Sequence, residues 1–397
     1  MSESEVVVVG AGPVGALAAL GLAQRGHEVL LLEAEPALTE APRAIVYYWH
    51  VLPGLEALGL LDDMDRAGIR NTAFRNRVLA SGSEAVVSLA PLAQVTDRPW
   101  NVHLGQHELV KIALEHLAQM PNAQLRLGSP VSGVKADHDG VTLQVGGERE
   151  EEVRASWVLG ADGARSTVRS SLGIPFEGTT WDDRFVATDL RYPFDDAGGL
   201  GNANMVMDPR HGCVIARIDD TGLWRWTWGE PAELPAETVM DRLPDRLRSL
   251  GFPELPYEVI RATPYRMHQR AASRMREGRV LLLGDAAHAT NPTGGLGLTS
   301  GTYDVFALLD PLDQVLRGGN VAALDHWATE RLRLFLEHAS PMATASKHLV
   351  YDETDIDKLE RVVFAAAHPV DEVETLQRLS ALTVLRSGMP RPHNSFA

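Results

Sequence analysis

The sequence has one cysteine, no block of lysine and arginine, and no long apolar run. Cys213 alone can form neither an internal disulfide nor a multi-thiolate metal site, and we expect it to be a small residue packed in a strand. The histidines do not cluster, so no metal site is expected. The formal charge of −16 at pH 7 disfavours nucleic acid as a partner. No apolar stretch reaches the ~18 residues of a membrane span, and the acidic start does not resemble a signal peptide. We therefore expect no membrane span and a cytoplasmic localisation.

The first 33 residues predict a βαβ unit. Residues 5–10 form a β-branched run that is typical of a buried strand. Residues 16–25 are rich in Ala and Leu and predict a helix, which Gly26 can end. Residues 27–33 predict a second strand.

The rest of the 397 residues predicts an α/β protein with two or three domains. Helices are predicted at 51–61 and 106–118, and strands at 73–90, 124–128, 131–137, 140–146, 153–158 and 279–284. Residues 181–265 alternate between polar and apolar, with a hairpin signature at 219–222, and predict a mainly antiparallel sheet. Helices dominate after residue 302. The fold class is therefore a Rossmann-like nucleotide-binding domain with an inserted, mainly antiparallel β-sheet domain and C-terminal helices. We assign residues 1–71, 103–175 and 276–340 to the first domain, 72–102 and 176–275 to the middle domain, and 341–397 to the helical segment.

A glycine-rich turn joins the first strand to the first helix. Gly10 permits a tight turn, Gly12 lets the backbone approach a pyrophosphate, and Gly15 lets helix and strand pack closely. The helix N-terminus offers free N–H groups to the anion. Glu33 ends the second strand, where an acid accepts bonds from ribose hydroxyls and disfavours a 2′-phosphate. The alternative is an ordinary glycine-rich turn, but strand, helix and acid together favour the adenosine of FAD or NAD.

A second motif spans residues 284–301, directly after a predicted buried strand. Its aspartate, Asp285, can accept a hydrogen bond from a polyol such as a ribityl chain. Glycines 294, 295, 297 and 301 leave room for a flat ring against bare backbone. The amides of the helix that follows would stabilise negative charge on a reduced flavin. The alternative is a glycine-rich surface loop, which the length of the motif and its place after an apolar strand disfavour.

Three motifs together resemble the group A flavin monooxygenases, the para-hydroxybenzoate hydroxylase-like aromatic hydroxylases. The motifs are the glycine turn with Glu33, the run 160–169 around Asp162 and Gly163, and the segment 284–301. The resemblance covers about residues 1–340. It implies an enzyme that binds FAD, takes electrons from NADH or NADPH, and uses molecular oxygen, as a flavin C4a-hydroperoxide, to hydroxylate a phenolic or heteroaromatic small molecule.

The resemblance also implies roles for single residues. Gly10, Gly12, Val14 and Gly15 would contact the FAD pyrophosphate, Glu33 the adenosine ribose, and Val131 the adenine. Arg43 would contact the FAD phosphates and also the pyridine nucleotide, and Gln106 the pyrophosphate or ribityl chain. Asp162 would serve both nucleotides, and Asp285 would hold the ribityl chain. The isoalloxazine would be lined by Pro292, Gly295, Gly297, Leu298 and Thr299.

The chain departs from the family pattern at three positions near the flavin. The family often has proline at Asn291, glutamine at Leu296 and asparagine at Thr299. These differences could alter substrate choice or flavin mobility, but they do not challenge FAD binding. His288 fits a structural role, hydrogen-bonding the loop that would hold the flavin, better than that of a base.

The substrate pocket should lie between the FAD domain and the middle sheet. The candidate catalytic residues are Tyr47, His211, Arg217 and Trp226, with Tyr48 and His50 as further candidates for the pocket. Arg217 could pair with a carboxylate or phenolate, and His211 could accept a phenol proton. A packed aromatic or a solvated charge is the alternative for each.

Two other functions stay open at this stage. One is a flavoenzyme of the same fold that performs epoxidation, Baeyer–Villiger oxidation or reduction, and the other is a non-catalytic FAD-binding protein. The residues do not separate NADH from NADPH. A homodimer is expected from family habit only.

Overall fold

The computed structural model describes residues 2–147 and 149–387. One sheet carries the N-terminal βαβ unit and runs in the order β17-β18-β11-β1-β2-β8. Its central strands β18, β11, β1, β2 and β8 are parallel neighbours, and β9 and β10 extend it as an antiparallel layer beside β11. The strands are β1 (Ser2–Val9), β2 (Val29–Leu32), β8 (Ala123–Arg126), β9 (Val131–Ala136), β10 (Val141–Val145), β11 (Glu151–Gly160), β17 (Arg276–Glu277) and β18 (Val280–Leu282). The predicted βαβ opening and antiparallel layer are confirmed.

Three helices pack around this sheet and around one another. They are α1 (Pro13–Gln24), α4 (Gln106–Leu117) and α8 (Leu296–Leu316). Helix α1 is buried from Gly15 to Ala23 because it lies between the sheet, α4 and α8 and so has no polar face. Gly21 lets α8 approach closely, since a Cβ there would meet the side chain of Leu309 at 2.6 Å. The core of the first domain therefore forms from segments that are far apart in sequence, as the contact of Gly21 with Leu309 shows.

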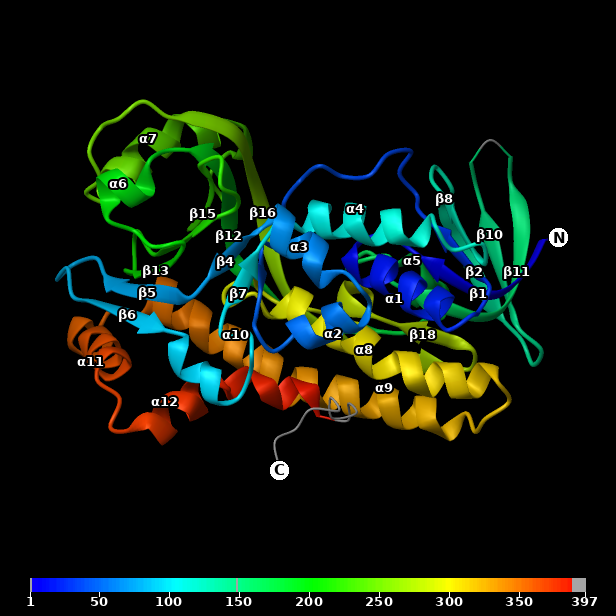
Figure 1. Ribbon diagram of the computed structural model, residues 1–397. Helices are drawn as coiled ribbons and strands as arrows, with labels where there is room; N and C mark the ends of the chain where they lie inside the picture. The colour runs from blue at the N-terminus through cyan, green and yellow to red at the C-terminus, as the bar shows by residue number, and fades with distance from the viewer. Residues whose placement is uncertain (1, 148, 388–397) are drawn as a thin grey trace.

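The middle sheet contains eight strands in the order β19-β16-β12-β15-β14-β13-β5-β6. Only the β13–β5 pair is parallel, so the predicted antiparallel character is confirmed. The strands are β5 (Ala73–Val78), β6 (Glu84–Ser88), β12 (Phe176–Arg191), β13 (Ala203–Met207), β14 (Cys213–Arg217), β15 (Leu223–Pro231), β16 (Glu258–Ala272) and β19 (His288–Ala289). Helices α6 (Phe194–Gly198) and α7 (Val239–Ser249) lie over its far end (Figure 1).

A small sheet of β3 (Val46–Tyr47), β7 (Asn101–His103) and β4 (Ile69–Asn71) joins the two large sheets. Two short helices, α2 (Leu52–Ala57) and α3 (Leu61–Ala67), stand where one helix was predicted at 51–61. The break falls at Gly59, whose φ of +76° does not fit a continuous helix.

The C-terminal helices run beneath both domains (Figure 1). They are α9 (Ala322–Leu334), α10 (Ser340–Lys347), α11 (Ile356–Ala367) and α12 (Glu372–Leu379), with π-helical turns η4 (Phe335–Ala339) and η5 (His348–Asp352) on either side of α10. None of the helices in residues 2–147 and 149–387 combines the length and apolar character needed to cross a bilayer. Residues 388–397 of the predicted helical segment lie outside the described residues, and the domain boundaries given above stay a prediction.

Two histidines at the junction of the sheets are buried in uncharged form. Burial, with the nearby charge of Arg386, lowers the pKa of His50 to about 3. Burial also lowers the pKa of His103 to about 4, although its Nδ1 lies 2.9 Å from the carbonyl of Arg217. In the unfolded chain both should titrate near the ordinary histidine value of about 6.5.

These histidines predict a loss of stability on mild acidification. Below about pH 6.5 the unfolded chain binds protons that the folded chain does not, so the free energy of unfolding falls as pH falls. At pH 5 each histidine should lower it by about 2 kcal/mol relative to pH 7. Urea unfolding at pH 7 and pH 5 measures this loss. His103→Asn should lose about half as much stability as the wild type; an equal loss would contradict the assignment.

Candidate active site

The order of the parallel sheet brings the three sequence motifs together at one edge. Gly10 follows β1, Glu33 follows β2, Asp162 follows β11 and Asp285 follows β18. Because these strands are parallel neighbours, their carboxyl ends meet at the same edge. The structure therefore brings together residues that the sequence predicted from separate motifs.

The glycine turn is in close contact with the motif around Asp162. Gly10 has a φ of +100°, and a Cβ there would meet the carbonyl oxygen of Ala161 at 2.5 Å. A Cβ on Gly15 would meet the carbonyl oxygen of Gly10 at 1.9 Å. By contrast, a Cβ on Gly12 would meet nothing within 4 Å. The turn is thus closed on its protein side and open at Gly12, where a pyrophosphate would approach.

The segment 284–301 packs against the glycine turn through the side chain of Val14. A Cβ on Gly284, whose φ is +55°, would lie 2.9 Å from a methyl group of Val14, and one on Gly301 would lie 2.7 Å from it. The side chain of Val14 therefore fits between two glycines of the third motif. The expected contact of Val14 with the pyrophosphate would therefore come from its backbone, not from its side chain.

Glu33 is held in place at the end of β2. Its carboxylate accepts hydrogen bonds from the backbone N–H of Ala11 at 2.7 Å and of Glu35 at 3.0 Å. The backbone of Glu33 also accepts a bond from Ser129 at 2.8 Å, which brings the segment leading to Val131 alongside. These contacts fit the expected adenosine end of the site.

The loop that carries Arg43 is fixed from two sides. The backbone N–H of Gln106, at the start of α4, bonds the carbonyls of Pro42 and Ala44 at 2.8 Å. From the middle sheet, Arg225 donates to the carbonyl of Arg43 and pairs with the buried carboxylate of Asp189. Arg43 is the only non-glycine residue with a positive φ in the described part of the chain, at 45°. A strained residue held this firmly is typical of a ligand site.

The two aspartates at this edge, Asp285 and Asp162, differ in their hydrogen bonding. The carboxylate of Asp285 is exposed and accepts no hydrogen bond from the described residues. The surrounding protein nevertheless displaces part of its water, which raises its pKa. The charges of His288 and Arg43 oppose that rise. Asp162 instead accepts bonds from the Ser166 hydroxyl at 2.5 Å and from the N–H of Val168 at 3.0 Å. Asp285 is therefore free for a ligand, whereas the Asp162 side chain fixes the first turn of the short helix that follows it, α5 (Thr167–Ser171).

The glycine-rich loop ends in the N-terminus of α8. Gly295 is the N-cap, so no side chain caps the free amides of this helix. Gly297 lies in its first turn, and a Cβ there would be 4.0 Å from the Asp285 carboxylate. Pro292 is exposed and Leu298 is half-buried, whereas the hydroxyl of Thr299 bonds back to the Gly295 carbonyl at 2.9 Å. A helix N-terminus with open amides beside an unbonded carboxylate suits a flat, electron-accepting ring and its polyol chain.

His288 lies behind this loop in a buried charge network. Its Nε2 is 2.8 Å from Asp304, and its ring stacks on Phe335 with centroids 4.3 Å apart. Asp304 also accepts bonds from the N–H of Gly284 at 3.0 Å and from Arg331 at 3.0 Å. His288 is 0% exposed, which agrees with a structural role rather than that of a base.

The residues at this edge fit FAD. Gly12 leaves space for the pyrophosphate, Glu33 is positioned for a ribose, and Asp285 offers an acceptor beside the open amides of α8.

Comparison with known proteins also indicates an FAD-binding protein. A family model described as an FAD binding domain matches residues 3–338. Two bacterial relatives are 43% and 41% identical to the chain: 6-hydroxy-3-succinoylpyridine 3-monooxygenase of Pseudomonas putida, over 88% of this chain and 90% of its own, and para-nitrophenol 4-monooxygenase of a Pseudomonas species, over 86% of each.

The chain belongs to the group A flavin-dependent monooxygenases. It is similar to a solved structure, the p-nitrophenol 4-monooxygenase of Pseudomonas putida, with a TM-score of 0.93 and 38% identity over 97% of this chain and 99% of that one. A second similar structure, a complex of aklavinone-11 hydroxylase with FAD and aklavinone, has a TM-score of 0.80 and 28% identity over 89% and 70% of the two chains. The chain is thus an FAD-dependent aromatic hydroxylase that consumes NADH or NADPH.

Three of the four candidate catalytic residues of the monooxygenase lie on the side of the middle sheet that α7 covers. Trp226 is 1% exposed and belongs to the core between the sheet and α7. Arg217 bonds the carbonyls of Asp219 and Asp220. His211 lies 3.5 Å from Arg246 of α7, and burial lowers its pKa. The sequence shows which residues share a face, but only packing shows which face meets the flavin.

The candidates near the Arg43 loop pack inside the first domain. Tyr47 is 1% exposed in the main core, and its hydroxyl has no partner among the described residues. Tyr48 donates to the carbonyl of Gly294 at 2.6 Å, and burial raises its pKa to about 12. His50 stacks between Tyr48 and Tyr303 and bonds the Tyr303 hydroxyl at 2.7 Å. Of these three, Tyr48 is the one that touches the flavin loop.

No sequence motif pointed to Arg225 or to its neighbours on the inner face of the middle sheet, which is the face opposite the three tryptophans of β15. Strand β15 reads Trp224-Arg225-Trp226-Thr227-Trp228, so the strand period places Arg225 and Thr227 opposite the tryptophans. That alternation was the signal that could have found them.

Proposed function

We propose that the monooxygenase binds its aromatic substrate on the inner face of the middle sheet, opposite the flavin loop. One cross-strand row supports this proposal. Its members are Ala187, Thr227, Val214, Met205 and Asn76, each the direct neighbour of the next. The row lies on the face opposite the tryptophans. Ala187, Val214 and Met205 are only half-buried, and the row is small and largely apolar, as the floor of a pocket for a single ring requires.

The borders of the row add polar and aromatic groups. On one side stands the next row, with Asp189 and Arg225, which holds the Arg43 loop. On the other side stand Phe185, Tyr265 and Tyr351, whose rings contact one another. Aromatic edges favour an aromatic ligand. Burial raises the pKa of Tyr265, so its hydroxyl stays protonated near neutral pH and can donate a hydrogen bond.

The chemistry of the relatives narrows the substrate class. In both of their names the numbered site of oxygenation is the ring position opposite the hydroxyl, and that position already carries a substituent. We infer that this chain also acts on a hydroxylated benzene or pyridine ring that is substituted opposite the hydroxyl. When bound, FAD supplies the hydride acceptor and the activation of oxygen. The protein holds the ring against the row and excludes water.

A cluster of positive charge marks where the pyridine nucleotide could dock. Arg270, Arg165 and Arg266 lie close enough to lower the pKa of His268 further, after desolvation. In a chain of net charge −16 this group stands out. It lies beside the Asp162 motif, because Arg165 belongs to that motif. Such a cluster suits the phosphates of NADH or NADPH.

A panel of ring compounds tests the substrate proposal. The holoenzyme is mixed with NADH or NADPH under air and with phenols or hydroxypyridines substituted opposite, or beside, the hydroxyl. We expect nucleotide oxidation to be stimulated by the first set, with oxygen incorporated at the substituted carbon by mass spectrometry. A best substrate that is unsubstituted there would contradict the proposal. A lactone, epoxide or reduced product would instead indicate another chemistry of the same fold.

Two variants on strand β14 test the position of the pocket. Val214→Phe should lower kcat/KM at least about tenfold, because the larger ring fills the floor of the pocket. Arg217→Met, three residues away on the opposite face, is the matched control and should leave KM unchanged. FAD absorption should be normal in both proteins. A raised KM in Arg217→Met with no change in Val214→Phe would place the pocket on the other face.

A further inference from the structure

The flavin loop, residues 291–295, begins at Asn291, whose amide side chain is buried. This residue is 0% exposed. Its Oδ1 accepts a hydrogen bond from the N–H of Thr293 at 3.0 Å, and its Nδ2 donates to Oε1 of Gln269 at 3.0 Å. Both ends of the Asn291 amide are therefore engaged, one within the loop and one outside it.

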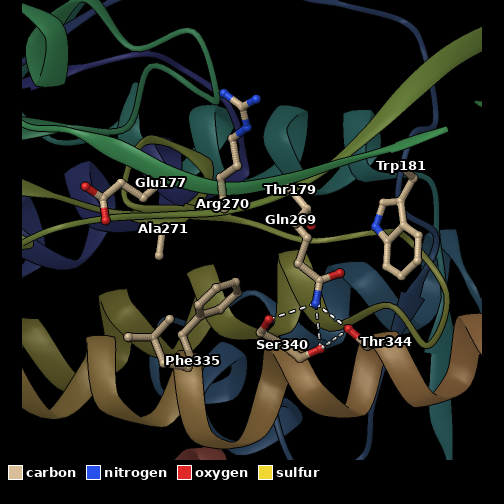
Figure 2. A pocket seen from close by; sticks show the side chains of 11 residues that line it. Glu177, Thr179, Trp181, Gln269, Arg270, Ala271, Phe335, Ser340 and Thr344 are labelled. Carbon is tan, nitrogen blue, oxygen red and sulfur yellow. Dashed lines mark hydrogen bonds between the residues drawn. The ribbon is translucent and has the colours of Figure 1, made fainter.

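Gln269, on β16, carries this contact on to helix α10. Its Nε2 donates to the carbonyl of Ser340 at 2.7 Å, with the hydroxyls of Ser340 and Thr344 at 2.7 and 2.6 Å. Figure 2 shows the Gln269 amide pointing from the strand toward these two residues of the helix, in a groove that Trp181 and Phe335 also line. A continuous hydrogen-bonded path thus joins α10, the middle sheet and the flavin loop.

The other end of the loop is anchored to the first domain. Tyr48 donates to the Gly294 carbonyl at 2.6 Å, and the N–H of Gly295 bonds the Pro292 carbonyl at 3.0 Å. Between the anchors, Gly294 and Gly295 both have positive φ, at 86° and 64°. Glycine adopts such angles at no steric cost and has many other conformations open to it, so the two glycines alone do not fix the backbone. The loop conformation therefore depends on its two anchors.

We propose that Gln269 and Asn291 are positioning residues that set the flavin loop and tie it to α10. The proposal rests on the placement of the flavin at this loop. Where the resemblance leads one to expect proline, a ring would restrict the backbone without a partner. Asparagine has no such restriction, so it needs an external acceptor, which Gln269 provides. The pair is uncharged, and its effect should not change with pH.

Three variants test the pair through their non-additivity. Gln269→Leu leaves the Asn291 N–H group unpaired, and Asn291→Pro leaves the Gln269 oxygen unpaired. The double variant removes both groups of the pair but also the bonds of Gln269 to α10 and of Asn291 to Thr293, so its loss should be smaller than the sum of the two single losses. Amide hydrogen exchange of residues 290–297 should rise at least about threefold in each single variant and rise no further in the double variant.

Holoenzyme measurements then link the loop to the flavin. Each single variant should shift the absorption and fluorescence of bound FAD and raise the share of nucleotide oxidation that ends in hydrogen peroxide by about threefold, with no further change in the double variant. The milder variant Thr344→Val should act in the same direction. Gln124→Leu, which changes an exposed glutamine on β8, is the control and should change nothing.

The outcomes separate this proposal from the placement of the flavin. Single-variant effects that simply add in the double variant, or exchange rates that do not change, would overturn the positioning role. Hydrogen exchange that follows the expected pattern in the FAD-free protein, with no change in the flavin spectrum of the holoenzyme, would uphold the anchor and overturn its link to the flavin.

Discussion

Asp285→Ala is expected to yield a protein that retains little FAD. The aspartate carboxylate lies at the carboxyl end of β18, is exposed and makes no hydrogen bond within the described residues, so it is free to accept one from the polyol chain of FAD. Loss of hydrogen bonds to a charged group costs about 1.5–3 kcal/mol each, or roughly ten- to 150-fold in affinity. The ratio of visible to ultraviolet absorption in the purified protein measures FAD occupancy, and fluorescence titration of the apoprotein measures Kd.

Asp285→Asn separates hydrogen bonding from charge. The asparagine keeps one acceptor and should retain FAD better than alanine does. The alanine variant should still unfold with nearly wild-type stability in its apo form, because the carboxylate does not hold the fold together. Full occupancy of the alanine variant would remove Asp285 from the site.

Arg331→Met is expected to destabilise the protein by about 3–5 kcal/mol, because it takes the guanidinium away from a buried carboxylate that keeps only His288 and the N–H of Gly284 as partners. Arg331 and Asp304 have side chains only 2% and 0% exposed, and they lie 3.0 Å apart. Burial alone would raise the pKa of Asp304, but His288 and Arg331 hold it below its ordinary value. Arg331 also donates to the Leu385 carbonyl at 2.7 Å, which fastens the C-terminal segment. Urea unfolding of the apoprotein at pH 7 measures the loss.

Arg333→Met is the matched control on the same helix. Arg333 is 41% exposed and pairs with Glu330 and Glu337 at the surface. Surface pairs contribute about 0–1 kcal/mol, so this variant should stay close to the wild type. Equal losses in the two variants would show that the buried network contributes no more than a surface pair.

The FAD site could be predicted from sequence because its signals are local. A β-branched strand, a glycine turn and an acid at the next strand end lie within 33 residues, and the segment 284–301 carries its own glycines and aspartate. These residues are constrained by their contact with backbone: Gly10 and Gly284 have positive φ and lie against their neighbours too closely for a side chain. Constraints of this kind are visible in the residue types themselves.

The substrate side could not be predicted because it depends on long-range packing. The alternation of Trp224, Trp226 and Trp228 showed that they share a face, but both faces of the middle sheet are covered, one by α7 and the other by the first domain and the C-terminal segment. The alternation of residues along a strand does not show which face packs against α7 and which packs against the first domain and the C-terminal segment. The packing places Trp226 and Arg217 on the side of α7 and Val214 and Thr227 on the opposite face, which is the basis of the proposed pocket.

The sequence by itself determined the flavin fold and the residues at the carboxyl ends of the parallel strands, because each of those positions is set by its own turn. Only the tertiary structure decided how the loop at 291–295 is held and which face of the middle sheet α7 covers. Gln269 bonds a residue 22 positions away, Tyr48 one 246 positions away and Arg225 one 182 positions away. Such contacts arise from the docking of separate elements, which no local pattern of residues records.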